Sequence, residues 1–322
     1  MTGAPTETRA PAVRHLPVGV ALVLVVASGA LTAGQARVNA ELGQRIGSAV
    51  LAAVISFGTG LVLVVTLLLA RPAGRRALAR WRSYGLRWWQ YLGGVGGAVF
   101  VLVAAYTVPV LGVGLMSVAQ VTGQIVGALV ADRFGLSPSG RQPLSAPRLV
   151  GAALGAAAVA ISALGRPSGE LDVFALALAV AAGFGLSLQS AVNGRLNQAA
   201  GDPLVATTVN FTVGTLTLLV ATAVTWLTVG LHLAALPGAG EWWLYLGGTA
   251  GVVFVTLNVI TVPVLGVLRL GLAAVAGQLA GALLFDALLP GGPGVSLPLA
   301  AGAVLTLLAF AVASRGRLGR TG

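Results

Sequence analysis

WWQYLGG at residues 88–94 returns as WWLYLGG at residues 242–248, and TVPVLG at 107–112 returns unchanged at 261–266. Both matches have the same offset of 154 residues, and 16 of the 25 positions from 88 to 112 are identical to their counterparts. A merely apolar composition does not align Trp, Tyr and Pro at one spacing. The chain therefore contains an internal repeat, which decides its architecture.

The repeat unit holds five apolar runs. The offset of 154 continues without a gap from Gln35 to Asp132, which correspond to Gln189 and Asp286. Each run has about the 20 residues that a membrane span requires. We predict the spans near 16–36, 48–70, 88–110, 113–132 and 149–165, and again near 172–194, 203–229, 242–264, 267–287 and 297–314.

The composition is that of an integral membrane protein. Hydrophobic residues make up 57% of the chain and charged residues 8%, whereas soluble domains carry about 25% charged residues. The net charge of +11 comes from 19 basic residues, all Arg, which lie between the apolar runs. This placement argues against a nucleic-acid partner and for a lipid bilayer. We predict an all-α integral membrane protein with about ten transmembrane helices.

Two further features of the sequence define its organisation. The apolar stretch after His15 resembles a signal peptide, but its polar pattern, Gln35 and Asn39, recurs mid-chain at Gln189 and Asn193, so we predict a retained first span. The predicted parts are a cytoplasmic tail, a first repeat, a linker, a second repeat and a second tail, at 1–15, 16–165, 166–171, 172–314 and 315–322.

The Arg residues predict the orientation. With ten spans, 16 Arg fall on the N-terminal side and three, Arg37, Arg45 and Arg166, on the other. Cytoplasmic loops of membrane proteins carry an excess of Arg and Lys. We therefore expect the protein to lie in the inner (plasma) membrane with both termini in the cytoplasm. Five spans is an odd number, so the second repeat should be inverted. Accordingly, the loop before Trp88 carries six Arg and the loop before Trp242 none. Inverted repeats are a recurrent plan of secondary transporters.

These motifs resemble a known family. The paired Gly-Gly…Val-Pro-Val-Leu-Gly segments, the Gly-Gln pairs at 123–124 and 277–278, and the run 132–136, DRFGL, are similar to the YdcZ-type branch of the drug/metabolite transporter superfamily. The resemblance covers nearly the whole chain beyond the N-terminal tail. It implies two fused five-helix units that carry small metabolites or drugs, in the direction of export. After Asp286 the second copy departs from this run, because ALLP follows in place of RFGL.

Few polar side chains lie inside the predicted spans, and each is costly there unless it faces a cavity or another helix. Gln124 and Gln278 are about ten residues into their spans, which is about half the depth of a bilayer core. They are candidates to bind a polar substrate, and a Gln–Gln hydrogen bond between helices is an equally weighted alternative. Gln120 and Asn258 extend the candidate binding set, although their counterparts are Ala274 and Ala104.

Other polar residues are expected near the span ends. The candidates for lining two vestibules are Gln35, Asn39, Ser56, Gln189, Asn193 and Asn210, and ordinary contact with water at helix ends explains them equally well. Asp132 and Asp286 lie at the C-terminal ends of two spans and are weak candidates for ion coupling, with Arg133 as a candidate partner of Asp132.

The leading hypothesis is a secondary transporter, an exporter of a small polar metabolite or drug-like molecule that works by alternating access between the repeats. The alternative is a non-transporting scaffold or a channel-like protein. An enzyme is not expected, because catalytic groups do not gather at one depth and the two His residues, His15 and His232, lie in the tail and a loop. With no Cys, thiol chemistry is excluded, and we predict neither cofactor nor metal. The small-xxx-small glycine spacing leaves homo-oligomers open.

Overall fold

The computed structural model describes residues 16–136, 140–164, 171–230, 235–288 and 294–315. Its regular structure over these ranges is entirely helical, which confirms the all-α class. The α-helices are α1 (Val18–Ile46), α2 (Ala49–Ala70), α3 (Pro72–Ala79), α4 (Gly93–Arg133), α5 (Ala146–Ala163), α6 (Val173–Ala200), α7 (Pro203–Thr228), α8 (Gly247–Leu288) and α9 (Leu297–Arg315). Short 3-10 helices η1 (Trp81–Tyr84), η2 (Trp88–Tyr91) and η3 (Ala239–Leu246) precede the two long helices.

The predicted tails and linker lie almost wholly outside the described residues. Only Leu171 of the predicted linker and Arg315 of the second tail fall within them. The described chain therefore consists of the two predicted repeats.

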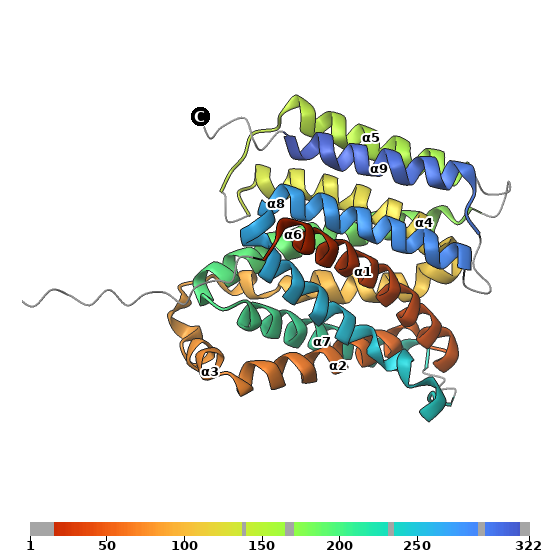
Figure 1. Ribbon diagram of the computed structural model, residues 1–322. Helices are drawn as coiled ribbons and strands as arrows, with labels where there is room; N and C mark the ends of the chain where they lie inside the picture. Colours follow the sequence, from red (N-terminus) through yellow and green to blue (C-terminus); the bar gives the residue numbers. More distant parts are fainter. Residues whose placement is uncertain (1–15, 137–139, 165–170, 231–234, 289–293, 316–322) are drawn as a thin grey trace, which may run out of the picture.

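The helix α4 folds back on itself. At Gly112 the backbone has φ 75° and ψ 164°, a conformation that glycine adopts readily. In a straight helix, Gly93 and Gly127 would be about 50 Å apart. Instead Gly93 lies against Asn193 and Gly127 against Ser187, which are six residues apart on α6. The ribbon of α8 reverses in the same way (Figure 1).

Eight described segments are long and apolar enough to cross a membrane, namely α1, α2, α4, α5, α6, α7, Leu270–Leu288 and α9. We call the two halves of each folded helix, before and after its reversal, its first and second legs. The two legs of α4 are counted together in this set, and the first leg of α8 is not part of it. When each leg is counted, the described elements correspond to the ten spans that the sequence predicts.

Each repeat packs its first helix against the long hairpin of the other repeat. Gly29 of α1 lies against the carbonyl oxygen of Ala274 in α8, and its counterpart Gly183 of α6 lies against the carbonyl oxygen of Gln120 in α4. A Cβ at these glycines would come within 2.0 and 1.9 Å of those oxygens. Figure 1 shows α1 running along α8. The repeats are thus interlocked, and α5 and α9 pack together at one edge.

A pseudo-twofold axis passes between Phe57 and Phe211. These residues are equivalent at the offset of 154, and their ring centroids are 5.1 Å apart. Each ring also lies against the glycine of the other repeat's helix, Gly60 for Phe211 and Gly214 for Phe57. The helices α2 and α7 therefore meet at this axis as two inverted copies, on the side of the bundle opposite α5 and α9 (Figure 1).

Two helices are longer than expected. The first extends to Ile46 rather than about 36, and α6 extends to Ala200 rather than about 194. Beyond the predicted end of the first span, Arg37 and Glu41 form an i,i+4 ion pair of 3.5 Å that suits a helix. Each helix ends at a glycine in the left-handed conformation, Gly47 and Gly201.

Candidate functional site

The candidate vestibule residues lie inside helices, where they form two equivalent clusters. In the second repeat, Nδ2 of Asn193 on α6 donates a hydrogen bond of 2.9 Å to Oδ1 of Asn210 on α7. Their counterparts in the first repeat are Asn39 on α1 and Ser56 on α2. Both of these are 1% exposed. Their side-chain nitrogen and oxygen atoms have no hydrogen-bond partner among the described residues.

The cluster at Asn193 lines an open cavity of about 200 Å³. Its walls come from α6, α7 and the first leg of α8, and its polar lining consists of amide and hydroxyl groups of Gln189, Asn193, Asn197, Thr207 and Asn210. The Oε1 atom of Gln189 is buried and has no hydrogen-bond partner among the described residues. Buried polar atoms usually have a hydrogen-bond partner, so this oxygen is an acceptor that the described residues leave unused.

The equivalent space in the first repeat is filled. The counterparts of Thr207 and Val255, at Ala53 and Val101, are buried. Beyond them Leu42, Ile46 and Leu244 form a buried apolar cluster with Ala52. On the open side the residues equivalent to Ile46 and Leu244 are Ala200 of the second repeat and Gln90 of the first, which are smaller or polar.

An ion pair spans the filled side. Arg45, near the end of α1, lies 3.0 Å from the carboxylate of Glu241 in η3. Their counterparts are Ala199 and Arg87, so the open side has no equivalent pair. The exposed fractions of 58% for Arg45 and 35% for Glu241 indicate that this pair contributes about 1 kcal/mol or less.

The central glutamines do not form the symmetric pair of Gln124 with Gln278. Nε2 of Gln278 donates a hydrogen bond of 2.9 Å to Oε1 of Gln120, and both residues are buried. This bond joins the second legs of α4 and α8. Gln124, the counterpart of Gln278, instead lines a separate cavity of about 230 Å³ together with Arg148, Ser187 and Ser190. The hydroxyl of Ser187 donates to the backbone oxygen of Gln124 over 2.6 Å.

The two aspartates have protein partners. The carboxylate of Asp132 accepts a hydrogen bond from buried Arg148 on α5, and the two form an ion pair. The neighbouring Arg133 is exposed and is not the partner described for Asp132. Asp286 accepts backbone hydrogen bonds from Val113 at 2.9 Å and Gly114 at 2.7 Å. It therefore caps the second leg of α4, directly after the turn at Gly112.

The structure also adds residues that sequence reasoning missed. Asn197 and Thr207 line the open cavity. Asn197 is four residues after Asn193, which is the spacing of one helix face, and this signal could have found it. Arg148 could not be found in this way, because only the fold brings α5 to Asp132. The side chain of the candidate Asn258 lies outside the described residues.

Comparison with known proteins identifies the chain's relatives. A family model described as "Putative inner membrane exporter, YdcZ" matches residues 20–161 and 174–312, which are the two repeats. None of the curated proteins matches the chain. A solved structure described as "Crystal structure of protein" is similar with a TM-score of 0.59 and 18% identity, over 94% of this chain and 99% of that one. At this identity the similarity concerns the fold alone.

Proposed function

Since the chain belongs to the YdcZ family of multi-pass inner membrane exporters, we propose that it exports a small polar solute by alternating access between its two inverted repeats. The cavity at Asn193 and Asn210 is the proposed solute site. Its counterpart at Asn39 and Ser56 is the proposed exit, closed in this conformation.

One observation carries the proposal. Equivalent polar clusters lie on the two sides of the pseudo-twofold axis, and the cluster at Asn193 lines an open cavity, whereas Asn39 and Ser56 in the other are 1% exposed. The other has buried, unsatisfied polar atoms beneath an apolar cluster. Burying such atoms without hydrogen bonds is costly, so a conformation that opens this side regains hydrogen bonds to water or solute. An exchange between two such conformations is the basis of alternating access.

The barrier between the two clusters is proposed to lie at the axis. The ring of Phe57 approaches Gly97 beside Gln189, and the ring of Phe211 approaches Gly251 beside Gln35. The two rings, tilted by 40° to each other, are therefore proposed to separate the open cavity from the closed cluster. A rocking of one repeat against the other would separate them on one side at a time.

The lining of the cavity suggests the class of solute. Amides offer both donors and acceptors, and hydroxyl groups do the same. None of the described residues that line the cavity is charged, and its volume of about 200 Å³ is below the roughly 300–1,000 Å³ of drug-sized sites. We therefore propose a small solute without net charge, such as a polar or zwitterionic metabolite.

Asp132 and Asp286 are proposed to act in the fold rather than in ion coupling. Arg148 neutralises Asp132, and two backbone N–H groups hold the Asp286 carboxylate. Both termini are proposed to lie in the cytoplasm, as the Arg distribution predicts. The open cavity would then face the cytoplasm, where an exporter must load.

The test is metabolite profiling of cells and medium with the protein deleted, native and overproduced. We expect one class of polar solute to accumulate inside the deletion strain and outside the overproducing strain. Asn193→Ala with Asn210→Ala should abolish the shift, whereas Gln124→Ala should preserve it, because Gln124 lines the other cavity. The reverse result would move the solute site to Gln124.

Purified protein in liposomes then separates the alternatives. With the solute so identified, saturable flux supports a carrier, and flux proportional to concentration at all levels identifies a channel. No flux of any shifted solute would indicate a scaffold and overturn the proposal.

A further inference from the structure

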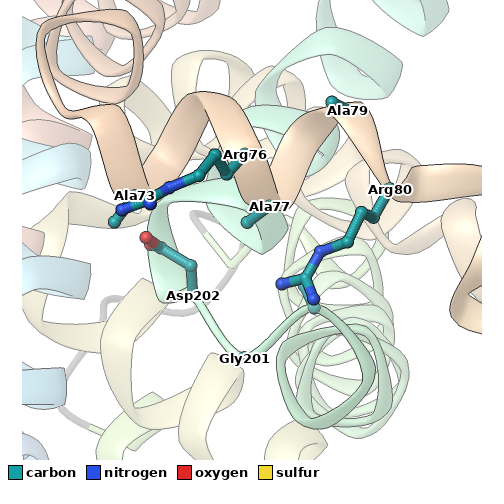
Figure 2. A pocket seen from close by; sticks show the side chains of 8 residues that line it. Ala73, Arg76, Ala77, Ala79, Arg80, Gly201 and Asp202 are labelled. Atoms are coloured by element: carbon teal, nitrogen blue, oxygen red, sulfur yellow. The ribbon is translucent and has the colours of Figure 1, made fainter.

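A second, larger cavity lies outside the proposed solute site, at one end of the bundle. It has a volume of about 640 Å³ and is formed between α3 and the turn that joins α6 to α7. Arg76 contributes from α3, Arg80 from the position directly after it, and Gly201 and Asp202 from the turn. Figure 2 shows Arg80 extending toward the turn at Gly201 and Arg76 running in the other direction along α3, toward Ala73.

The cavity carries uncompensated positive charge. Asp202 is its acidic residue, but the carboxylate accepts the backbone N–H of Leu204 at 2.9 Å and lies 3.5 Å from Arg71. It thus caps α7 and is already paired. Arg76 and Arg80 are exposed, and among the described residues no carboxylate forms an ion pair with either. Positions 71–87 contain six Arg and no acidic residue.

The segment is fixed to the end of the membrane spans. The helix α3 begins two residues after α2 ends, and Ala77 packs on Leu68 of α2 in a buried apolar cluster. The hydroxyl of Tyr84 donates to the backbone oxygen of Ala77 over 2.6 Å. Burial raises the pKa of the Tyr84 phenol, so this donor stays protonated at neutral pH.

Exposed indole rings place the segment at the level of lipid headgroups. Trp81 is 50% exposed and Trp88 is 76% exposed, one on each side of Tyr84 along the chain. Trp is enriched at the boundary between lipid and water, where its ring suits a partly apolar environment. The Arg-lined cavity is therefore positioned where lipid phosphates lie.

We propose that this cavity binds the phosphate of an anionic phospholipid headgroup, held by the guanidinium groups of Arg76 and Arg80. Guanidinium groups donate paired hydrogen bonds that match phosphate oxygens. Arg76 lies in the last turn of α3 and Arg80 is the residue directly after its end, and both line the same cavity. Basic pockets at the ends of membrane helices recognise lipid headgroups in this way.

The competing explanation is that these Arg residues serve only the charge bias of the loop. The two explanations differ in whether the effect of losing an Arg depends on its position. A charge bias depends on the number of Arg residues, whereas a headgroup site depends on Arg76 and Arg80 specifically. Arg82 and Arg133 provide the matched control, because both are exposed, do not line this cavity and carry the same total charge.

The experiment measures lipid binding to the purified full-length protein by native mass spectrometry, titrated with phosphatidylglycerol, phosphatidylcholine and glycerol 1-phosphate. We expect tighter binding of phosphatidylglycerol than of phosphatidylcholine. Arg76→Gln with Arg80→Gln should weaken the phosphatidylglycerol binding about 25-fold, on the order of fivefold per Arg. Arg82→Gln with Arg133→Gln should leave it within about threefold of the native protein.

Three outcomes would overturn the proposal. Equal losses in both double variants would leave charge bias as the explanation, and equal binding of the two lipids would remove the headgroup specificity. Glycerol 1-phosphate that binds as tightly as phosphatidylglycerol would make the ligand a soluble phosphate. Arg76→Lys with Arg80→Lys preserves the charge and should retain part of the binding, and a melting curve of each variant without lipid confirms that it is folded.

Discussion

The Nε2 atom of Gln278 donates a hydrogen bond to Oε1 of Gln120 over 2.9 Å, in the buried contact between the second legs of α8 and α4. These legs belong to different repeats. The bond therefore joins the inverted units near the middle of their longest elements, and it is a direct target for measuring how strongly the repeats are coupled.

The double-mutant cycle at this pair should be strongly non-additive. Gln278→Leu leaves the Gln120 amide buried without its partner, which we expect to cost on the order of 1–2 kcal/mol of unfolding free energy. Gln120→Leu with Gln278→Leu removes both polar groups, so its loss should be no larger than that of either single variant. Unfolding in mixed micelles with increasing SDS measures the cycle, and additive losses would rule out the bond.

Asp286 should act as a helix cap. Asp286→Ala removes both acceptors for the N–H groups of Val113 and Gly114, with an expected loss of about 1–2 kcal/mol. Asp286→Asn retains one acceptor oxygen and should lose roughly half as much. Thermal unfolding compares them. Equal losses in the two variants would mean that the charge, rather than the acceptors, stabilises the turn.

The close approach of α6 to α4 should be sensitive to one methyl group. At Gly123 a Cβ would lie 1.9 Å from the backbone oxygen of Val180, so Gly123→Ala must push the helices apart and should lose more than about 2 kcal/mol. The control is Gly58→Ala in α2, where nothing lies within 4 Å. That variant should be neutral or gain up to about 1 kcal/mol, and similar losses in both would contradict the packing argument.

The sequence contains no Cys, so single Cys residues can be introduced and labelled without first replacing any native Cys. Ser83 lies in η1 and Gln44 near the end of α1, and both are exposed. If both termini are cytoplasmic, a membrane-impermeant maleimide should label Ser83→Cys only in inside-out vesicles and Gln44→Cys only in intact spheroplasts. The opposite pattern would invert the proposed orientation, and with it the side from which the solute loads.

The Arg45–Glu241 pair should hold the closed side shut. Glu241→Arg places two like charges together and should raise the rate of maleimide labelling at Ser56→Cys severalfold, because the closed conformation loses about 1 kcal/mol or more. Arg45→Glu in the same protein restores an ion pair and should return labelling to its original rate. If labelling is unchanged by the charge reversal, the apolar cluster at Leu42 alone closes this side.

Sequence alone predicted the architecture because the repeat states the helix pattern twice. The recurrence of Trp, Tyr and Pro at the 154-residue offset, together with the opposite Arg content of the equivalent loops, was enough for ten spans and an inversion. The reversal of α4 at Gly112 separates the spans that the sequence predicts at 88–110 and 113–132, and the ribbon of α8 reverses in the same way (Figure 1).

The pairings of individual side chains could not be predicted in this way. Symmetry suggested Gln124 as the partner of Gln278, but Gln124 faces the cavity beside Ser187, and Gln120 one turn earlier faces α8. Similarly, adjacency suggested Arg133 for Asp132, whereas the packing of α5 brings Arg148 to it. A repeat fixes which helices correspond, but rotation of each helix about its own axis decides which side chains meet.

The exchange of helices between the repeats has a consequence for biosynthesis. The surface of α1 around Gly29 is completed by α8, and roughly 200 residues separate the end of α1 from the start of α8. At about 5–20 residues per second, a ribosome takes roughly 10–40 seconds to synthesise that interval. During this time the glycine face of α1 has already left the ribosome while its permanent neighbour does not yet exist. The nascent first repeat must therefore wait in the bilayer, shielded by lipid or an insertion factor, until translation is nearly complete.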